Sequence, residues 1–124
     1  MNRLLAVALV LVVLPGCGGD KAAALLSQGD QAMEVKDYDL ALSCFDDYVK
    51  ARPAEAAGYI RRGRVYRERG QLDKSIADYT EAIKLDPGSR LAYSGRSLAY
   101  FKAERFDEAK RDSDKADALA RASN

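Results

Sequence analysis

The feature that most constrains this chain is a regular spacing of residues that recurs along most of its length. Pro53 and Pro87 are separated by the same interval as Gly29 and Gly63. A fixed period of about 34 residues indicates stacked copies of one structural unit. This repeat period divides the chain into residues 22–55, 56–89 and 90–123 without an insertion. Other equivalent residues are Tyr59 with Tyr93, Tyr66 with Tyr100, and the series Tyr38, Leu72 and Phe106, each followed by Asp.

Each unit is predicted to be a pair of antiparallel helices. In the second unit, helical periodicity covers Tyr59–Arg69 and Leu72–Leu85, with Gly70 between them. Glycine readily takes the left-handed conformation that ends a helix, and Pro87 cannot continue one. Such a pair cannot bury its apolar face alone, so the pairs must stack on one another. Small residues that allow close packing stand at equivalent places, namely Gly29, Gly63 and Ser97 on the first helices and Ala41, Ser75 and Ala109 on the second.

The stretch from Gly58 to Pro87 resembles the tetratricopeptide-repeat (TPR) family. The resemblance implies an all-α solenoid of three antiparallel helix pairs wound into a right-handed superhelix. It also implies that the tyrosines are core residues rather than catalytic ones. Departures occur at Ala32 and Lys36 in the first unit and at Ser113, Asp117 and Arg121 in the third. The signature residues are Tyr59, Gly63, Tyr66, Gly70, Tyr79, Ala82 and Pro87.

In TPR proteins the first helices of successive units line a concave groove that receives a peptide or helix of another protein. The resemblance therefore predicts a protein-binding groove, with a basic centre and apolar flanks. The last helix, expected at Asp107–Ala120, is strongly polar and is interpreted as a cap. The inner-face positions are Leu26, Asp30, Met33 and Glu34 in the first unit, Ile60, Arg61, Arg64, Arg67 and Glu68 in the second, and Leu91, Leu98, Phe101 and Lys102 in the third.

Three arginines spaced three apart, Arg61, Arg64 and Arg67, share one helix face. One interpretation is a clamp for an acidic segment or a C-terminal carboxylate, because arginine binds carboxylates with two parallel hydrogen bonds. The other is a solvated or internally paired face, for example through an Asp30–Arg64 bridge. The chaperone-binding subclass of the family, which uses Lys and Asn, is not expected. Its key places hold Leu26, Asp30, Arg61, Leu91 and Gly95.

The first seventeen residues have the pattern of an export signal. A positive start is followed by an apolar run of eleven residues, Leu4–Leu14, whose helical length of ~16 Å is too short for a ~30 Å hydrocarbon core. The next residues complete Leu14-Pro15-Gly16-Cys17, which resembles the bacterial lipobox. That resemblance implies removal of residues 1–16, acylation (palmitate) of Cys17, and a short tether over residues 17–21. The alternative is an ordinary secreted protein with an incidental Cys17.

These features predict a lipid-anchored protein of the bacterial cell envelope. Gly18 follows the acylated position, where lipoproteins kept at the inner membrane carry Asp. In a host with two membranes this favours the periplasmic face of the outer membrane. The tether from Gly18 to Lys21 reaches only ~14 Å, so the domain would lie close to the bilayer.

The composition argues against several other functions. The chain has no His, which removes the commonest general base and zinc ligand. No catalytic residue, metal site or cofactor is predicted. The formal charge of +1 gives no electrostatic reason to bind nucleic acid. Cys44, the only thiol left after acylation of Cys17, is interpreted as a small buried apolar residue. The expected partner is another protein with an acidic or amphipathic segment.

Self-association is the competing hypothesis. Residues 22–55 carry 3 positive and 7 negative side chains, a net of −4. The two later units carry 7 and 5 and then 8 and 6, so each has a net charge of +2. Opposite ends could stack head to tail, although a monomer is the expectation for the isolated chain. Sedimentation at several concentrations separates the two hypotheses.

Overall fold

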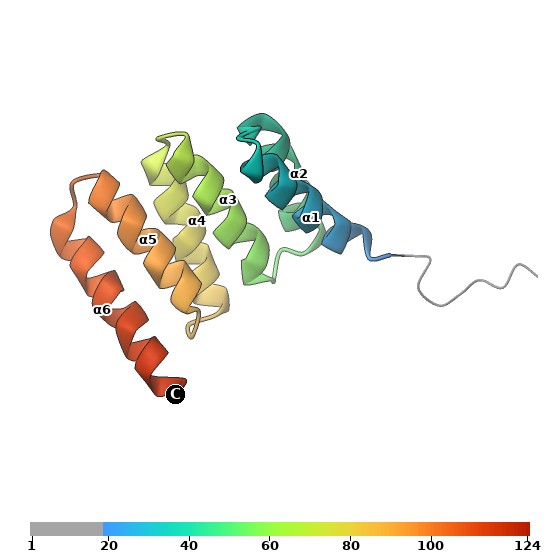
Figure 1. Ribbon diagram of the computed structural model, residues 1–124. Coiled ribbons are helices and arrows are strands. Elements are labelled where there is room, and N and C mark those ends of the chain that lie inside the picture. The colour runs from blue at the N-terminus through green and yellow to red at the C-terminus, as the bar shows by residue number, and fades with distance from the viewer. Residues whose placement is uncertain (1–18) are drawn as a thin grey trace, which may run out of the picture.

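The computed structural model describes residues 19–124, and this part of the chain is entirely helical and turn, with no strand. The helices pair as α1 with α2, α3 with α4, and α5 with α6, and the pairs stand in a row from one end of the chain to the other (Figure 1). The predicted all-α solenoid of three helix pairs is thereby confirmed. The helices are α1 (Lys21–Glu34), α2 (Tyr38–Ala51), α3 (Ala56–Glu68), α4 (Leu72–Leu85), α5 (Arg90–Lys102) and α6 (Phe106–Ala122).

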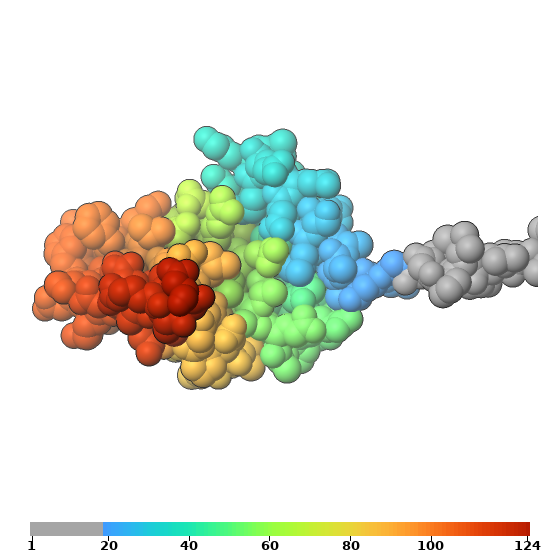
Figure 2. All heavy atoms as spheres, turned by 60° about the horizontal axis from the view of Figure 1, so that its bottom comes forward, coloured from blue at the N-terminus to red at the C-terminus, as the bar shows by residue number. Residues whose placement is uncertain are grey.

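The predicted export signal, residues 1–16, and the predicted acylation site, Cys17, lie outside the described residues. The described chain enters α1 at one end of the row, and Asn124 follows α6 at the other (Figures 1 and 2). Lys21 is already helical, and the Asp20 side chain accepts a hydrogen bond from the Ala22 N–H at 3.0 Å. None of the helices in residues 19–124 has the length and apolar character needed to cross a membrane.

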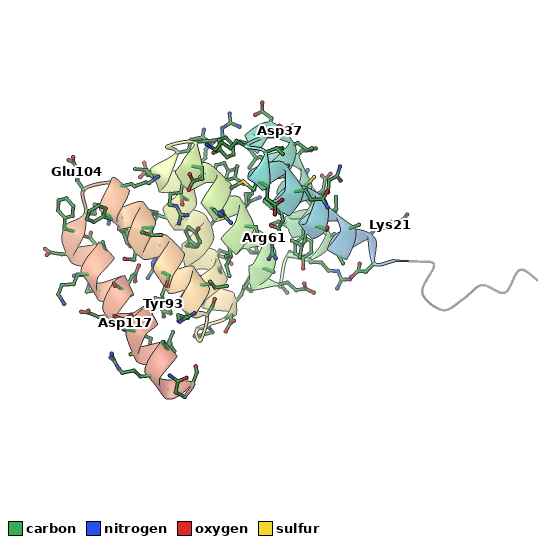
Figure 3. The ribbon with its side chains drawn as sticks, viewed as in Figure 1. Lys21, Asp37, Arg61, Tyr93, Glu104 and Asp117 are labelled. Carbon is green, nitrogen blue, oxygen red and sulfur yellow. The ribbon has the colours of Figure 1, made fainter. Side chains whose placement is uncertain are left out.

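The turn inside each pair uses the same backbone geometry three times. Lys36, Gly70 and Glu104 occupy equivalent places in the three repeats, and their φ angles are 59°, 75° and 59°. The residue after each one donates its N–H back into the helix, at 2.8 Å (Asp37 to Ala32), 2.8 Å (Gln71 to Tyr66) and 2.9 Å (Arg105 to Tyr100). This is the Schellman arrangement. The left-handed cap predicted at Gly70 is confirmed, and it recurs at two residues that are not glycine. Asp37 and Glu104 mark these turns at one end of the helices (Figure 3).

Small residues bring the helices into close contact. A Cβ atom on Gly29 would lie 2.4 Å from the fully buried ring of Phe45. Between α3 and α4, the buried Ser75 hydroxyl donates a 2.7 Å hydrogen bond to the Gly63 carbonyl. Phe45 also belongs to a core cluster with Ala32, Ala41 and Val65. The small residues at equivalent positions therefore act as predicted, because each one leaves room for a side chain or backbone of the facing helix.

A largely buried ion pair lies within the second helix pair, and an equivalent one lies within the third. Arg62 on α3 donates two hydrogen bonds to Asp78 on α4, at 2.8 and 2.9 Å, and a third to Asp46 of the preceding pair at 3.0 Å. Arg96 likewise donates two hydrogen bonds to Asp112, at 2.7 and 2.8 Å, and a third to the Thr80 hydroxyl of the preceding pair at 3.1 Å. Hydrogen bonding to Asp78 raises the pKa of Arg62 further above its usual value. Sequence analysis did not predict these pairs, although both partners recur after one repeat period.

The last helix pair leaves apolar surface uncovered. The helix α6 extends slightly beyond the predicted Asp107–Ala120 at both ends. Phe106, its first residue, packs edge-to-face on Phe101 of α5, with ring centroids 5.4 Å apart. Both rings are more than half exposed. In the earlier pairs the equivalent residues Tyr38 and Leu72 are only partly exposed.

Candidate functional site: a groove across the first helices

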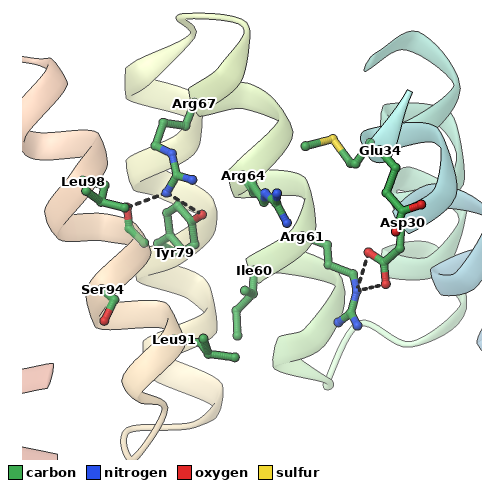
Figure 4. Close-up of a pocket in the computed structure, with 12 residues that line it drawn as sticks. Asp30, Glu34, Ile60, Arg61, Arg64, Arg67, Tyr79, Leu91, Ser94 and Leu98 are labelled. Atoms are coloured by element: carbon green, nitrogen blue, oxygen red, sulfur yellow. Dashed lines mark hydrogen bonds and ion pairs between the residues drawn. The ribbon is translucent and has the colours of Figure 1, made fainter. Parts of the chain in front are cut away.

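A groove of about 660 Å³ crosses the first helix of every pair (Figure 4). The helices α1, α3 and α5 each contribute side chains, and α4 contributes one residue from behind. Its lining consists of Asp30, Met33 and Glu34 from α1, Ile60, Arg61, Arg64 and Arg67 from α3, Tyr79 from α4, and Leu91, Ser94, Gly95 and Leu98 from α5.

The structure brings most of the predicted inner-face residues together, but not all of them. Leu26 is partly buried and packs against the core cluster instead. Phe101 packs on Phe106 beyond the end of the groove. Lys102 and Glu68 do not line the groove either. The predicted residues that do line it are Asp30, Met33, Glu34, Ile60, Arg61, Arg64, Arg67, Leu91 and Leu98.

Arg61 is neutralised by the neighbouring repeat. Its Nε atom donates to both carboxylate oxygens of Asp30, at 3.0 and 3.1 Å. The sequence suggested that Asp30 pairs with Arg64. That suggestion is wrong, because Asp30 pairs with Arg61 instead. Successive repeats are rotated relative to one another, so equivalent positions do not face each other, and Asp30 lies opposite Arg61 (Figure 4). Part of the basic patch is internally paired, as the second interpretation of the sequence allowed.

Arg64 differs from its two neighbours because it has no carboxylate within ion-pair distance among residues 19–124. Its side chain is exposed and points into the groove from the middle of α3 (Figure 4). Among the groove arginines it is therefore the one that can bind an incoming anion without first breaking an internal ion pair.

Arg67 is held against the floor of the groove. Its guanidinium donates to the Tyr79 hydroxyl at 3.4 Å and to the Gly95 carbonyl at 3.5 Å, and it lies 3.5 Å from the Glu68 carboxylate. Only 11% of its side chain is exposed. These contacts are long, so they orient the arginine while leaving its charge weakly compensated.

Tyr79 forms part of the floor, which sequence analysis did not predict. Tyr79 lies on a second helix and was assigned to the core, where its ring is 2% exposed. A Cβ atom on Gly95 would lie 2.2 Å from that ring, so the missing side chain is what lets the ring edge reach the groove. Burial raises the pKa of the Tyr79 hydroxyl, which keeps it protonated. The signal that could have indicated this contact is the glycine itself, on the inner face of a helix.

Charge changes in order across the groove. The α1 side carries Asp30 and Glu34, the α3 side carries the three arginines, and the α5 side carries Leu91 and Leu98. The sequence predicted apolar flanks on both sides of a basic centre. Only the α5 flank is mainly apolar, because the α1 flank combines Met33 with two carboxylates.

The remaining thiol is remote from this chemistry. Cys44 on α2 is 4% exposed, and burial raises the pKa of its thiol. Its place as a small buried residue agrees with the prediction. Within residues 19–124 no group of three or more acidic or cysteine side chains is arranged to hold a metal ion.

The described residues form a solenoid of helical hairpins with a groove along its first helices, and several known proteins are similar to it. Residues 63–103 match the family model described as TPR repeat. The chain is 33% identical, over 72% of its length, to the small glutamine-rich tetratricopeptide repeat-containing protein 2 of Mycosarcoma maydis. The match spans only about a quarter of the length of that protein and of similar curated relatives.

Solved structures support the same assignment. The Sgt2 TPR domain from Aspergillus fumigatus has a TM-score of 0.78 at 27% identity, over 81% of this chain and 66% of that one. The first TPR of Spaghetti (RPAP3), bound to the HSP90 peptide SRMEEVD, has a TM-score of 0.77 at 26% identity, over 80% of this chain and 79% of that one. Residues 63–103 therefore resemble a TPR repeat, and the described residues have the fold of TPR domains.

Proposed function

We propose that this protein is a membrane-anchored adaptor of the bacterial envelope, which binds a peptide or helix of another protein in its concave groove. The observation that carries the proposal is Arg64, a cation with no carboxylate partner among residues 19–124, beside exposed leucines on the facing side of the same groove. Exposed apolar side chains beside an accessible charged group are typical of surfaces that recognise another protein. The role is binding, with no catalytic residue, metal or cofactor.

Similarity to peptide-bound TPR domains supports an acidic segment as the ligand. The peptide bound to the first TPR of Spaghetti, SRMEEVD, contains three acidic residues. A carboxylate on the ligand of this chain would meet Arg64 first, because Asp30 already neutralises Arg61. Electrostatic attraction of this kind sets the orientation of the ligand and speeds its association.

Anchoring at the membrane belongs to the same proposal and rests on the sequence before residue 19. The apolar run and the lipobox-like sequence ending at Cys17 support export and acylation. More than one acyl chain is needed for durable anchoring, because a single chain binds a bilayer only marginally. Substitution Cys17→Ser tests this part. Mass spectrometry of the native protein is expected to show acyl chains on residue 17 that the Cys17→Ser protein lacks, and a native protein without them would contradict acylation at that residue.

Affinity capture from solubilised envelopes tests the binding role. The bait is the full chain, compared with Arg64→Glu and with the control Arg111→Glu, which makes the same charge change on the exposed surface of α6. We expect a protein that is retained by the native bait and by the control but reduced at least tenfold by Arg64→Glu. Circular dichroism must show equal helix content in all three. Equal capture by all three baits would contradict binding of the partner through Arg64.

A structural role through self-association is the second candidate, and the exposed rings of Phe101 and Phe106 favour it. They lie on the last helix pair, which is basic, whereas the first pair is acidic. Sedimentation velocity of the chain over a hundredfold concentration range separates the candidates. An adaptor keeps one sedimentation coefficient, while a stacking protein sediments faster as concentration rises and loses that dependence in high salt.

A further inference from the structure

The shape of the groove's ligand can be inferred from how the lining residues are arranged along the helices. Charge varies across the groove, from α1 to α3 to α5, and each helix keeps its own chemistry over the lined length. A ligand that crosses the three helices would meet acidic, basic and apolar surface in turn. A ligand that lies parallel to them would meet basic surface along one flank and apolar surface along the other.

The apolar side of the groove runs along a helix for almost two turns. Leu91 and Leu98 are 66% and 52% exposed. Seven residues apart, they share one face of α5 and lie about 10 Å apart along its axis. Ser94 and Gly95 between them are small, which leaves a hole between the leucines above the Tyr79 ring. A chain crossing α5 at one level would cover one leucine and leave the other in water. Both are covered only by a ligand that lies along α5.

Leucines at this spacing with a hole between them match the surface of another helix. Apolar residues at one place in successive heptads form the seam by which two helices pack, each knob entering a hole on its partner. Arg64 on α3 and Leu98 on α5 both line the groove, and they stand at a similar height along their helices in the view of Figure 4. The position for an acidic side chain is therefore beside the apolar seam. On the far side of the arginines, Asp30 and Glu34 repel a second acidic row.

We propose, on the basis of the proposed function, that the ligand is an amphipathic helix of another protein lying along α5. Its apolar side chains, seven residues apart with one between them, cover Leu91 and Leu98 and fill the hole above Gly95. An acidic residue on its flank pairs with Arg64.

Photo-crosslinking in the native cells tests this geometry with the full chain. Benzoylphenylalanine replaces Leu91, Leu98 or Arg64 in separate strains, and Lys84 in a control strain, since Lys84 is exposed on α4 outside the groove. The crosslinked partner residues are identified by mass spectrometry. Positions 91 and 98 are about 10 Å apart, which corresponds to seven residues of a helix but only three of an extended strand.

We expect positions 91 and 98 to label one segment of another protein at residues six to eight apart, with an acidic residue within one turn of the site labelled from position 64. Labelled residues three or fewer apart would show that the ligand is extended rather than helical. That result would overturn this proposal and leave the proposed function in place. Labelling of a second copy of this chain would overturn the proposal that the ligand belongs to another protein. No labelling from any groove position would overturn both this proposal and the proposed function.

A charge substitution tests the acidic flank separately. The yield of the crosslink from position 98 is expected to fall at least tenfold when Arg64→Glu is added, and to change less than twofold with Arg111→Glu. An unchanged yield with Arg64→Glu would overturn the pairing of an acidic residue with Arg64 while leaving the apolar seam in place.

Discussion

Substitution Gly95→Ala is expected to destabilise the protein, although alanine is the better helix former. Gly95 lies inside α5, where alanine is favoured over glycine by about 1 kcal/mol. The added Cβ atom, however, would lie 2.2 and 2.3 Å from two ring carbons of Tyr79 and 2.8 Å from its hydroxyl oxygen. The ring is 2% exposed and also lies against Gly63, so it cannot move away without displacing a neighbouring helix.

The size of the effect follows from these two opposing contributions. Forcing extra atoms into a well-packed site costs about 1–3 kcal/mol, and distances this short place Gly95→Ala at the upper end. After subtraction of the helix-propensity gain, we expect the free energy of unfolding to fall by about 1–2 kcal/mol. Urea unfolding followed by circular dichroism measures this change directly.

A second substitution, Tyr79→Leu, tests whether the Tyr79 ring determines the sign of the stability change. Leucine at position 79 is smaller than tyrosine and leaves space for the new methyl group. In a Tyr79→Leu background, Gly95→Ala should therefore stabilise the protein, by up to about 1 kcal/mol from helix propensity alone. If Gly95→Ala stabilises the native background, or destabilises both backgrounds equally, the ring does not lie against Gly95 and the floor of the groove is wrongly described.

Three further predictions concern the turns, the ion pairs and the thiol. Lys36→Gly should raise the free energy of unfolding by about 1 kcal/mol in urea denaturation, because its φ of 59° disfavours a side chain; no change would contradict a left-handed cap there. Asp78→Ala should cost about 2–3 kcal/mol by leaving a largely buried arginine without its main partner. The matched control is Asp39→Ala, because the Asp39 side chain pairs with Arg69 and is 88% exposed. It should cost less than about 1 kcal/mol, and equal costs for the two substitutions would contradict the burial of the Arg62–Asp78 pair. Burial raises the pKa of the Cys44 thiol, so in a Cys17→Ser chain a thiol reagent at pH 8 should label it slowly when folded and rapidly in urea; equal rates would place the thiol at the surface.

The repeat architecture was predictable because the features that specify it are local and recur. The repeat period, a glycine at the turn and a proline after the second helix define a hairpin without knowledge of its neighbours. The structure adds that Lys36 and Glu104 take the same conformation as Gly70. In those two turns the hydrogen bonds of the helix ends and the packing of the pair impose a geometry that the residue itself disfavours.

The contacts between repeats were harder to predict because they depend on how one pair is rotated on the next. That rotation sets Asp30 against Arg61 rather than Arg64. It also directs the Tyr79 ring toward the groove at Gly95. The Arg62–Asp78 pair lies within one hairpin and recurs as Arg96–Asp112, so its period was visible. The burial of this pair could not be predicted, because charged residues on a helix are usually solvated.

The measurement that tests the central claim most directly is a charge exchange between Arg64 and the partner. Once the segment crosslinked from position 98 is known, its acidic residue nearest Arg64 is replaced by lysine, and the affinity is measured for all four combinations with Arg64→Glu. The account predicts that each single change weakens binding by ten- to a hundredfold, about 1–3 kcal/mol. Together the two changes should restore most of the affinity. If the double change binds no better than the single ones, or if Arg64→Glu alone has no effect, Arg64 does not pair with an acidic residue of the partner, and the central claim is wrong.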